Sequence, residues 1–177
     1  MNKVLYPGSF DPMTKGHMNI VDQASDIFDE VVVAVMQNPT KPRGFFTLEE
    51  RMEMVKEIAK RWKNVKVVLG SGAAVDVAIL NECKAIVRGL RSLSDYAQEA
   101  QLQQINKDIS NNKVNTVCLF ADTEYQFVSS SMVKEVFKLD KDISNYVEPY
   151  VYEKMKEKRK LYEWTCDNTI RYSITLL

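Results

Sequence analysis

Short apolar runs of strand length alternate along the chain with longer segments in which apolar residues recur at helical spacing. The runs that predict strands are Lys3–Tyr6, Glu30–Met36, Val65–Leu69, Lys84–Val87 and Val114–Ala121. Apolar residues three or four positions apart indicate amphipathic helices. The segments with this pattern are Gly16–Phe28, Thr47–Trp62, Ala73–Glu82, Ser92–Ile109, Ser129–Phe137 and Glu148–Lys160. The second of these begins TLEE, a capping-box pattern in which Thr47 caps the helix and Glu50 reaches back.

This alternation predicts an α/β fold: a single-domain, doubly wound (Rossmann-like), five-stranded parallel sheet with helices on both faces. No repeat, low-complexity tract or flexible linker divides residues 1–160, so they are expected to form one domain. Residues 161–177 are expected to be a peripheral or non-native tail, with an extra helix or strand or a contact with a partner as the alternatives. In such sheets the crossovers are right-handed and ligands bind at the carboxyl ends of the strands. We therefore expect functional residues in the segments that follow each strand.

Charge and composition narrow the classes of function. The 177 residues carry 24 Lys and Arg against 24 Asp and Glu, so no overall field draws the chain to nucleic acid or membrane, and any anion site must be local. The start MNKVLYPG lacks a signal-peptide pattern and no apolar run could span a bilayer, which favours a cytoplasmic protein. Cys83, Cys118 and Cys166 form no CxxC pair. Two of them lie in or beside apolar segments, as is typical of reduced core thiols.

The only histidine lies in YPGSFDPMTKGH, between the first predicted strand and the first predicted helix. If this helix begins near Gly16, its free backbone N–H groups favour an anion, and His17 in the first turn can donate a hydrogen bond to it. The alternative is that His17 only helps to cap the helix. The strand–turn–helix context favours a phosphate site, although neither GxxxxGK[ST] nor GxGxxG is present.

Other residues after predicted strands also suit phosphate groups. Lys41, Arg88 and Arg91 each fall in a predicted loop, where lysine offers a mobile charge and arginine a planar fork. Solubility is the alternative, and it fits most of the 24 basic residues. Ser129–Ser131 precede a helix start, where one serine suffices as N-cap and three suit a polyphosphate. The Glu99 carboxylate either accepts a hydrogen bond from a ribose hydroxyl or faces water.

The chain shows no nucleophile–base pair and no cluster of histidines and cysteines for a metal. Basic groups and helix N-termini instead suit chemistry in which the substrate brings its own nucleophile. Direct phosphoryl or nucleotidyl transfer is such chemistry, because positioning and charge stabilisation carry most of the catalysis.

The stretch GSFDPMTKGH resembles the G-[ST]-F-D-P-x-T-x-G-H signature of the bacterial phosphopantetheine adenylyltransferases, within the HxGH nucleotidyltransferase superfamily. NPTK…FTLEER, VRGLRSLSDYAQEAQLQQIN and FVSSSMVKE match in order and spacing, so the resemblance extends over residues 2–160. It implies transfer of the adenylyl group of ATP to 4′-phosphopantetheine, giving dephospho-coenzyme A and pyrophosphate by direct in-line attack with Mg²⁺. It also implies a homohexamer and feedback inhibition by coenzyme A.

Matched position by position, the resemblance also implies roles. His17 would stabilise the transition state, with Lys41 and Arg88 as further catalytic residues, and no residue would ligate a metal directly. Ser9, Lys41 and Arg88 would hold the phosphate of phosphopantetheine, with Ala74 near its pantetheine arm. The ATP site would comprise Ser9, Phe10, His17, Gly89, Leu90, Arg91, Glu99, Tyr125, Gln126, Phe127, Val128, Ser129, Ser130 and Ser131.

Three positions depart from the family pattern: Ser9 stands where many members carry Thr, Ala74 where a larger apolar residue is usual, and Gln98 where several relatives have an aromatic. Two other functions stay open at this point. One is a sister enzyme of the superfamily with another phosphate acceptor. The other is a module that senses ATP or coenzyme A without chemistry, against which His17 argues, since a sensor needs no group at the attacked phosphorus.

Overall fold

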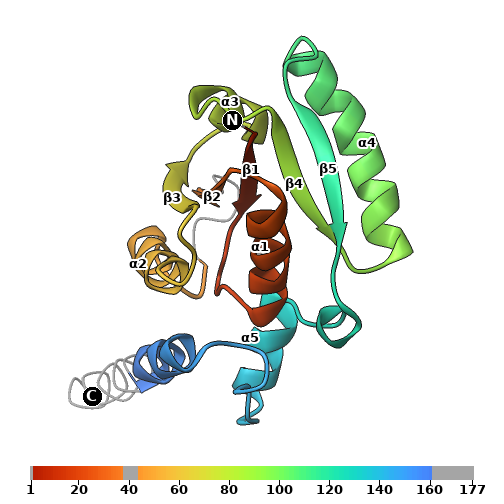
Figure 1. Ribbon diagram of the computed structural model, residues 1–177. Helices are drawn as coiled ribbons and strands as arrows, with labels where there is room; N and C mark the ends of the chain where they lie inside the picture. The colour runs from red at the N-terminus through yellow and green to blue at the C-terminus, as the bar shows by residue number, and fades with distance from the viewer. Residues whose placement is uncertain (1, 38–43, 161–177) are drawn as a thin grey trace, which may run out of the picture.

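The computed structural model describes residues 2–37 and 44–160, and these form one parallel sheet flanked by helices (Figure 1). The strands are β1 (Lys3–Gly8), β2 (Glu30–Met36), β3 (Val65–Gly70), β4 (Ala85–Leu90) and β5 (Asn115–Phe120). The helices are α1 (Lys15–Ile27), α2 (Leu48–Ala59), α3 (Ala74–Leu80), α4 (Leu93–Ile109), the 3₁₀ turn η1 (Thr123–Tyr125), α5 (Ser130–Lys138) and a helix over residues 149–160. The predicted fold class is confirmed.

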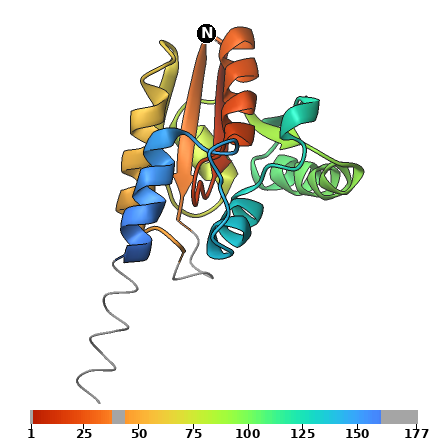
Figure 2. The ribbon, with the colours of Figure 1, turned by 90° about the horizontal axis from the view of Figure 1, so that it is seen from below.

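Two apolar clusters, one on each face of the sheet, hold the helices in place. Successive side chains of a strand point to opposite faces, so Val4 and Leu5 belong to different clusters. The cluster of Val4 packs α1, α2, α5 and the helix over residues 149–160 onto one face. The cluster of Leu5 packs α3 onto the other. Figure 2 shows the helix over residues 149–160 beside α2, where Lys158 pairs with Glu50.

The strand order is β3-β2-β1-β4-β5, with every neighbouring pair parallel. The chain builds outward from β1 to β3, then returns to the other side of β1 with β4. Between β1 and β4 the direction of winding therefore reverses, and the connections that leave these two strands go to opposite faces. Such a switch point opens a crevice at the carboxyl ends of the strands, which is where open α/β sheets bind ligands.

Three strands run further than their sequence pattern predicts, β3 by one residue to Gly70. β1 continues to Gly8 and β4 to Leu90. Arg88 therefore lies within β4, and the expectation that it sits in a loop is wrong. The physical reason is that the neighbouring strand β5 continues alongside the end of β4. It pairs Arg88 with Cys118 and Leu90 with Phe120, which keeps these residues of β4 in the sheet. Arg91 does follow the strand.

The environment of the thiols also differs in part from expectation. Cys83 is buried, as predicted, but Cys118 is exposed, because β5 is an edge strand of the sheet. Cys166 and the tail over residues 161–177 lie outside the described residues, as does Lys41. None of the helices within residues 2–37 and 44–160 combines the length and apolar character needed to cross a bilayer.

Candidate active site

A pocket of about 390 Å³ lies at the carboxyl ends of β1 and β4, between the first turns of α1, α4 and α5. Ten predicted site residues line it: Ser9, His17, Arg88, Gly89, Arg91, Glu99, Val128, Ser129, Ser130 and Ser131. The lining also includes Gln98, one of the departures from the family pattern. Segments far apart in the chain thus meet at the switch point, where the sequence pattern places a ligand.

Several predicted residues do not line this pocket: Phe10, Leu90, Ala74, Tyr125, Gln126 and Phe127. Phe10 is buried next to His17, with the two rings edge to face at 5.2 Å. Ala74 is the first residue of α3 and packs against the core cluster on that side of the sheet. Phe127 is 84% exposed, so any ligand contact it makes lies at the rim.

His17 both caps α1 and lines the pocket. Thr14 is the N-cap, and its side chain accepts from the backbone N–H of His17, three residues into the helix. In return the backbone N–H of Thr14 donates to Nδ1 of His17 at 3.0 Å. Nδ1 of His17 thus takes part in the helix cap, as the alternative interpretation predicted, while Nε2 takes no part in it. Because Nδ1 accepts, the proton of the neutral ring resides on Nε2.

The charge state of His17 follows from its surroundings. Burial, and then the nearby Arg91 cation, lower the pKa of His17 to about 4. Protonation would also place a second N–H against the N–H of Thr14, so the cap itself opposes the charged form. His17 is consequently a neutral N–H donor at physiological pH, suited to an oxygen on which negative charge develops.

The N-terminus of α5 meets the N-terminus of α1 across the pocket. A Cβ on Gly16 would lie 2.9 Å from the carbonyl oxygen of Val128, so only glycine allows this approach. Ser129 is the N-cap, its hydroxyl accepting from the N–H of Met132, while the Ser130 hydroxyl donates to the carbonyl of Pro12. Two helix N-termini thereby aim their partial positive charge at one volume.

The two arginines of the pocket are held by carboxylates of α4. Arg88 contacts Glu99 at 2.7 Å, and Arg91 contacts Asp95 at 3.2 Å. Of the two alternatives for Glu99, facing water is wrong, since its carboxylate pairs with Arg88 and orients it, while the contact with a ribose hydroxyl stays a prediction. Each guanidinium carries five N–H donors. These contacts leave most of the donors for phosphate oxygens.

The described side chains of the pocket bear on whether the protein itself could hold Mg²⁺. Within residues 2–37 and 44–160 no three His, Cys, Asp or Glu side chains gather closely enough to hold a metal. The pocket carboxylates of Asp95 and Glu99 are already paired with arginines. The side chains present do not suit Mg²⁺ as a protein-ligated ion.

Asp11 and Lys134 do not line the pocket, but they join segments that surround it, and they were not identified from the sequence. The Asp11 carboxylate is buried and accepts from the N–H groups of Phe45 and Phe46, at 2.9 and 2.8 Å, and from Nζ of Lys134 at 3.0 Å. It thereby joins the β1–α1 loop to α5 and to the segment before α2. The available signal was a carboxylate set between Phe10 and Pro12, where a solvated charge is unusual.

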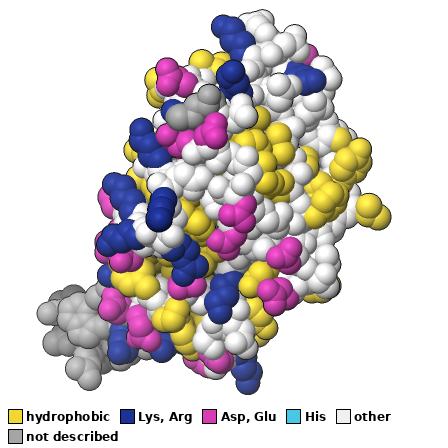
Figure 3. Space-filling model, in the orientation of Figure 1, with side chains coloured by type: hydrophobic (Ala, Val, Ile, Leu, Met, Phe, Trp, Pro, Cys, Tyr) yellow, Lys and Arg dark blue, Asp and Glu magenta, His cyan; other side chains and the backbone are white. Residues whose placement is uncertain are grey.

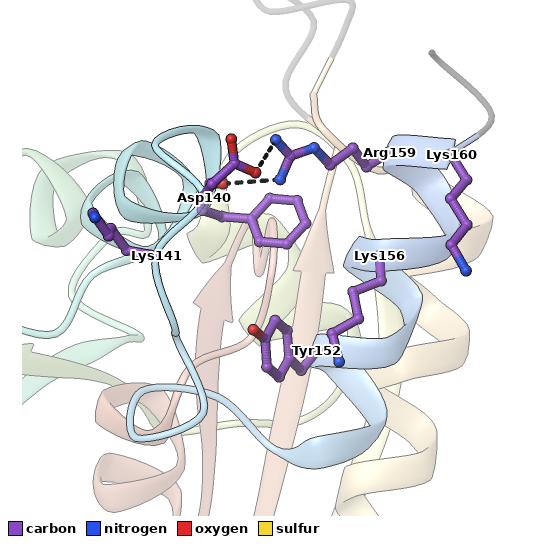
Figure 4. A pocket seen from close by; sticks show the side chains of 7 residues that line it. Asp140, Lys141, Tyr152, Lys156, Arg159 and Lys160 are labelled. Atoms are coloured by element: carbon purple, nitrogen blue, oxygen red, sulfur yellow. Dashed lines mark hydrogen bonds and ion pairs between the residues drawn. The ribbon is translucent and has the colours of Figure 1, made fainter. Parts of the chain in front are cut away.

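A second hollow, of about 500 Å³, lies between the end of α5 and the helix over residues 149–160 (Figure 4). Its cations are already engaged or directed elsewhere. Arg159 contacts Asp140, Lys156 lies 4.0 Å from the ring centre of Tyr152, and Lys141 points away from them. It contains no predicted site residue, and we assign it to packing of the last described helix.

Comparisons with known proteins agree with this geometry. The family model described as cytidylyltransferase-like matches residues 5–136. A curated phosphopantetheine adenylyltransferase from Heliobacterium modesticaldum is 47% identical over 158 residues, which are 89% of this chain and 93% of that protein.

Solved structures share the fold at low identity. A protein from Vibrio parahaemolyticus assigned as a nicotinate-nucleotide adenylyltransferase superposes with a TM-score of 0.63 at 18% identity, over 86% of this chain and 91% of that one. The nicotinic acid mononucleotide adenylyltransferase of Plasmodium falciparum gives 0.61 at 18% identity, over 92% and 97%. These likenesses concern the fold alone. The family match and the 47% identity carry the assignment: the chain belongs to the cytidylyltransferase-like nucleotidyltransferases and, among them, to the phosphopantetheine adenylyltransferase family.

Proposed function

We propose that this chain transfers the adenylyl group of ATP to 4′-phosphopantetheine, releasing dephospho-coenzyme A and pyrophosphate in the cytoplasm. The observation that carries the proposal is the 47% identity to a curated phosphopantetheine adenylyltransferase over 93% of its length. The pocket supports it, because two helix N-termini and two arginines surround one volume. Such a volume suits polyphosphate chemistry.

The reaction needs little from the protein beyond positioning and charge stabilisation. A phosphate oxygen of phosphopantetheine forms a bond to the α-phosphorus of ATP, while the bond from that phosphorus to the bridging oxygen of pyrophosphate breaks. The attacking oxygen is already anionic, so no general base is required. A neutral Nε2–H of His17 can donate to the α-phosphate oxygen as charge gathers there, which makes His17 the transition-state stabiliser.

The other proposed site residues divide between those that would bind phosphopantetheine and those that would bind ATP. Ser9, Arg88 and Lys41 would hold the acceptor phosphate, and the pantetheine arm would extend toward Ala74. The nucleotide would lie toward β4 and α5, with its phosphates at the pocket-lining serines. The residues proposed for it are Ser9, Phe10, His17, Gly89, Leu90, Arg91, Glu99 and residues 125–131. Coenzyme A contains the phosphopantetheine group and would compete for the acceptor side as an inhibitor.

Magnesium would enter with the nucleotide. ATP carries its own phosphate oxygens, which are hard ligands of the kind that Mg²⁺ prefers. The pocket then has only to accommodate the MgATP complex through its arginines and N–H groups. This fits the pairing of both pocket carboxylates with arginine.

A homohexamer is the proposed assembly, and α4 offers a surface for self-association. This helix has no buried residue, and it exposes Leu102, Ile105 and Ile109 at 41%, 52% and 54%. Their spacing places them on one side of the helix. Figure 3 shows hydrophobic side chains gathered on the side of the molecule where α4 and β5 lie. An apolar helix face left in water is a typical contact surface between copies of a chain.

The test is pyrophosphate release from ATP with 4′-phosphopantetheine as acceptor. Turnover with it, and none with nicotinate mononucleotide, would support the proposal. Turnover only with another phosphate acceptor would identify a sister enzyme, and binding of ATP and coenzyme A without turnover would identify a sensing module. Arg88→Ala should mainly raise the KM for phosphopantetheine, and an unchanged KM would contradict the role given to Arg88.

A further inference from the structure

Arg51 has no part in the roles considered so far, yet it touches both strand ends on the acceptor side of the site. Its Nη1 donates to the carbonyl oxygen of Ser9 at 2.6 Å and to that of Met36 at 3.1 Å. Met36 is the last residue of β2, and Ser9 follows β1 directly. One nitrogen with two N–H groups therefore joins the carboxyl ends of two neighbouring strands.

The position of Arg51 is set by the start of α2. Thr47 and Glu50 form a reciprocal capping box, and the N–H of Arg51 makes the next helical hydrogen bond, to the Thr47 carbonyl at 3.1 Å. A cation in the first turn is disfavoured by the helix dipole, which prefers anions there. The helix dipole thus disfavours the position of the Arg51 cation, and the hydrogen bonds to Ser9 and Met36 explain why an arginine stands there.

Nothing else among the described residues explains the charge of Arg51. No carboxylate within residues 2–37 and 44–160 forms an ion pair with it, and its Nε is buried there without a hydrogen-bond partner. Its neighbour Glu50 is engaged instead by Lys158 and by Thr47. A half-buried guanidinium that binds only backbone carbonyls costs desolvation free energy, and a solubility role would not require that cost.

We propose that Arg51 is a positioning residue for the acceptor phosphate. It fixes the backbone of Ser9, whose hydroxyl is proposed to hold that phosphate, and it ties this backbone to the end of β2. Ser9 and Phe10 are also proposed for the nucleotide, but most of its proposed contacts come from β4, α4 and the segment that leads into α5, whereas the two hydrogen bonds of the Arg51 guanidinium go to the ends of β1 and β2. Loss of Arg51 should therefore act on the acceptor more than on ATP. This inference rests on the proposed function for the identity of the acceptor.

The kinetic test compares Arg51→Met and Arg51→Lys in the full chain. Arg51→Met keeps an unbranched, flexible stem but removes the guanidinium and every donor, so the KM for phosphopantetheine should rise about tenfold while the KM for ATP stays within about twofold. Arg51→Lys keeps the charge and should recover part of the loss, since an ammonium reaches carbonyls without the planar fork. Arg61→Met is the matched control, because Arg61 lies just beyond α2 and pairs with Glu148 away from the pocket.

A second measurement does not depend on the acceptor. Amide hydrogen exchange of the ligand-free protein should quicken at Ser9, Phe10 and Gln37 in Arg51→Met, and stay unchanged in α5. Equal rises of both KM values, or unchanged exchange at these amides, would overturn the proposal. If the wild-type chain releases no pyrophosphate with phosphopantetheine, the proposed function fails, and the exchange measurement still decides whether Arg51 holds the two strand ends.

Discussion

At the scale of single residues, the fixed tautomer of His17 connects the cap of α1 with the chemistry. The Thr14 N–H occupies Nδ1, so Nε2 keeps its proton. The ring is held edge-on against Phe10, which limits its rotation. A donor that is already oriented loses no free energy to reorganisation when the transition state forms. A histidine that only capped the helix would not have to line the pocket or keep a proton on Nε2.

His17→Ala should lower kcat by about 10²–10³-fold, the usual effect of removing one donor to developing charge. The affinity for ATP should stay within a few-fold, because the ground-state phosphates keep the arginines and helix N-termini. Pyrophosphate release measures the first quantity and calorimetric titration of ATP the second. A collapse of ATP binding together with activity would instead make His17 a ground-state binding residue.

The depressed pKa of His17 also predicts how stability depends on pH. Its pKa is about 4 in the folded protein against 6.5 for the free side chain, so between these values the unfolded chain binds more protons. Stability is complete above pH 6.5 and falls as pH falls toward 4. At pH 5 the contribution lost is on the order of 2 kcal/mol. Urea unfolding at pH 7 and pH 5 should show a smaller difference in His17→Gln than in the wild type. Equal differences in both proteins would mean that His17 titrates normally.

The Asp11–Lys134 pair should contribute to stability as a coupled unit. Asp11→Asn leaves Lys134 without its buried partner, and breaking one side of such a pair costs about 3 kcal/mol. Lys134→Met should cost a comparable amount, and the double variant less than the sum. Urea unfolding of the four proteins of this cycle measures the coupling. Additive losses would show that Asp11 acts only through the N–H groups of Phe45 and Phe46.

At the scale of elements, the site depends on how closely the N-termini of α1 and α5 approach each other. Gly16→Ala adds a Cβ 2.9 Å from the Val128 carbonyl, and backbone on both sides must shift. We expect a rise in the KM for ATP of about tenfold, because in the proposed function the phosphates of ATP would bind between these N-termini. Steady-state kinetics at saturating acceptor measure this.

Gly72→Ala is the control for Gly16→Ala. Gly72 has a φ of +78° and no atom near its absent Cβ, so the added methyl strains the backbone without a clash. Both variants should lose stability in thermal unfolding, because both strain the chain. Only Gly16→Ala should raise the KM for ATP. The same rise in Gly72→Ala would indicate that the effect comes from general destabilisation.

At the scale of the whole molecule, the exposed apolar face of α4 predicts assembly. Ile105→Lys places a charge in the centre of the face formed by Leu102, Ile105 and Ile109, and a charge buried without a partner disrupts a contact between copies. Light scattering after gel filtration should show smaller species for this variant. Gln104→Lys adds the same charge on a neighbouring side of α4 and should leave the assembly intact. An unchanged mass for Ile105→Lys would exclude this face as the contact.

The sequence by itself determined the order of the helices and strands. The spacing of apolar residues along the chain differs between a strand and a helix that each bury one face, and this spacing can be read without knowing what the element packs against. The sequence also determined the capping box of α2 and the segments that carry the site. Only the tertiary structure decided where strands end, which side chains are exposed and which distant residues are in contact, because the spacing of apolar residues carries no information on these. Arg88 lies in β4 because β5 continues beside it, and Cys118 is exposed because β5 is an edge. The partners of Asp11 are 34 to 123 residues away, and the carbonyls that Arg51 binds lie at the ends of two strands, 42 and 15 residues away. Long-range pairs of this kind arise only when the chain folds, since no local pattern links their members.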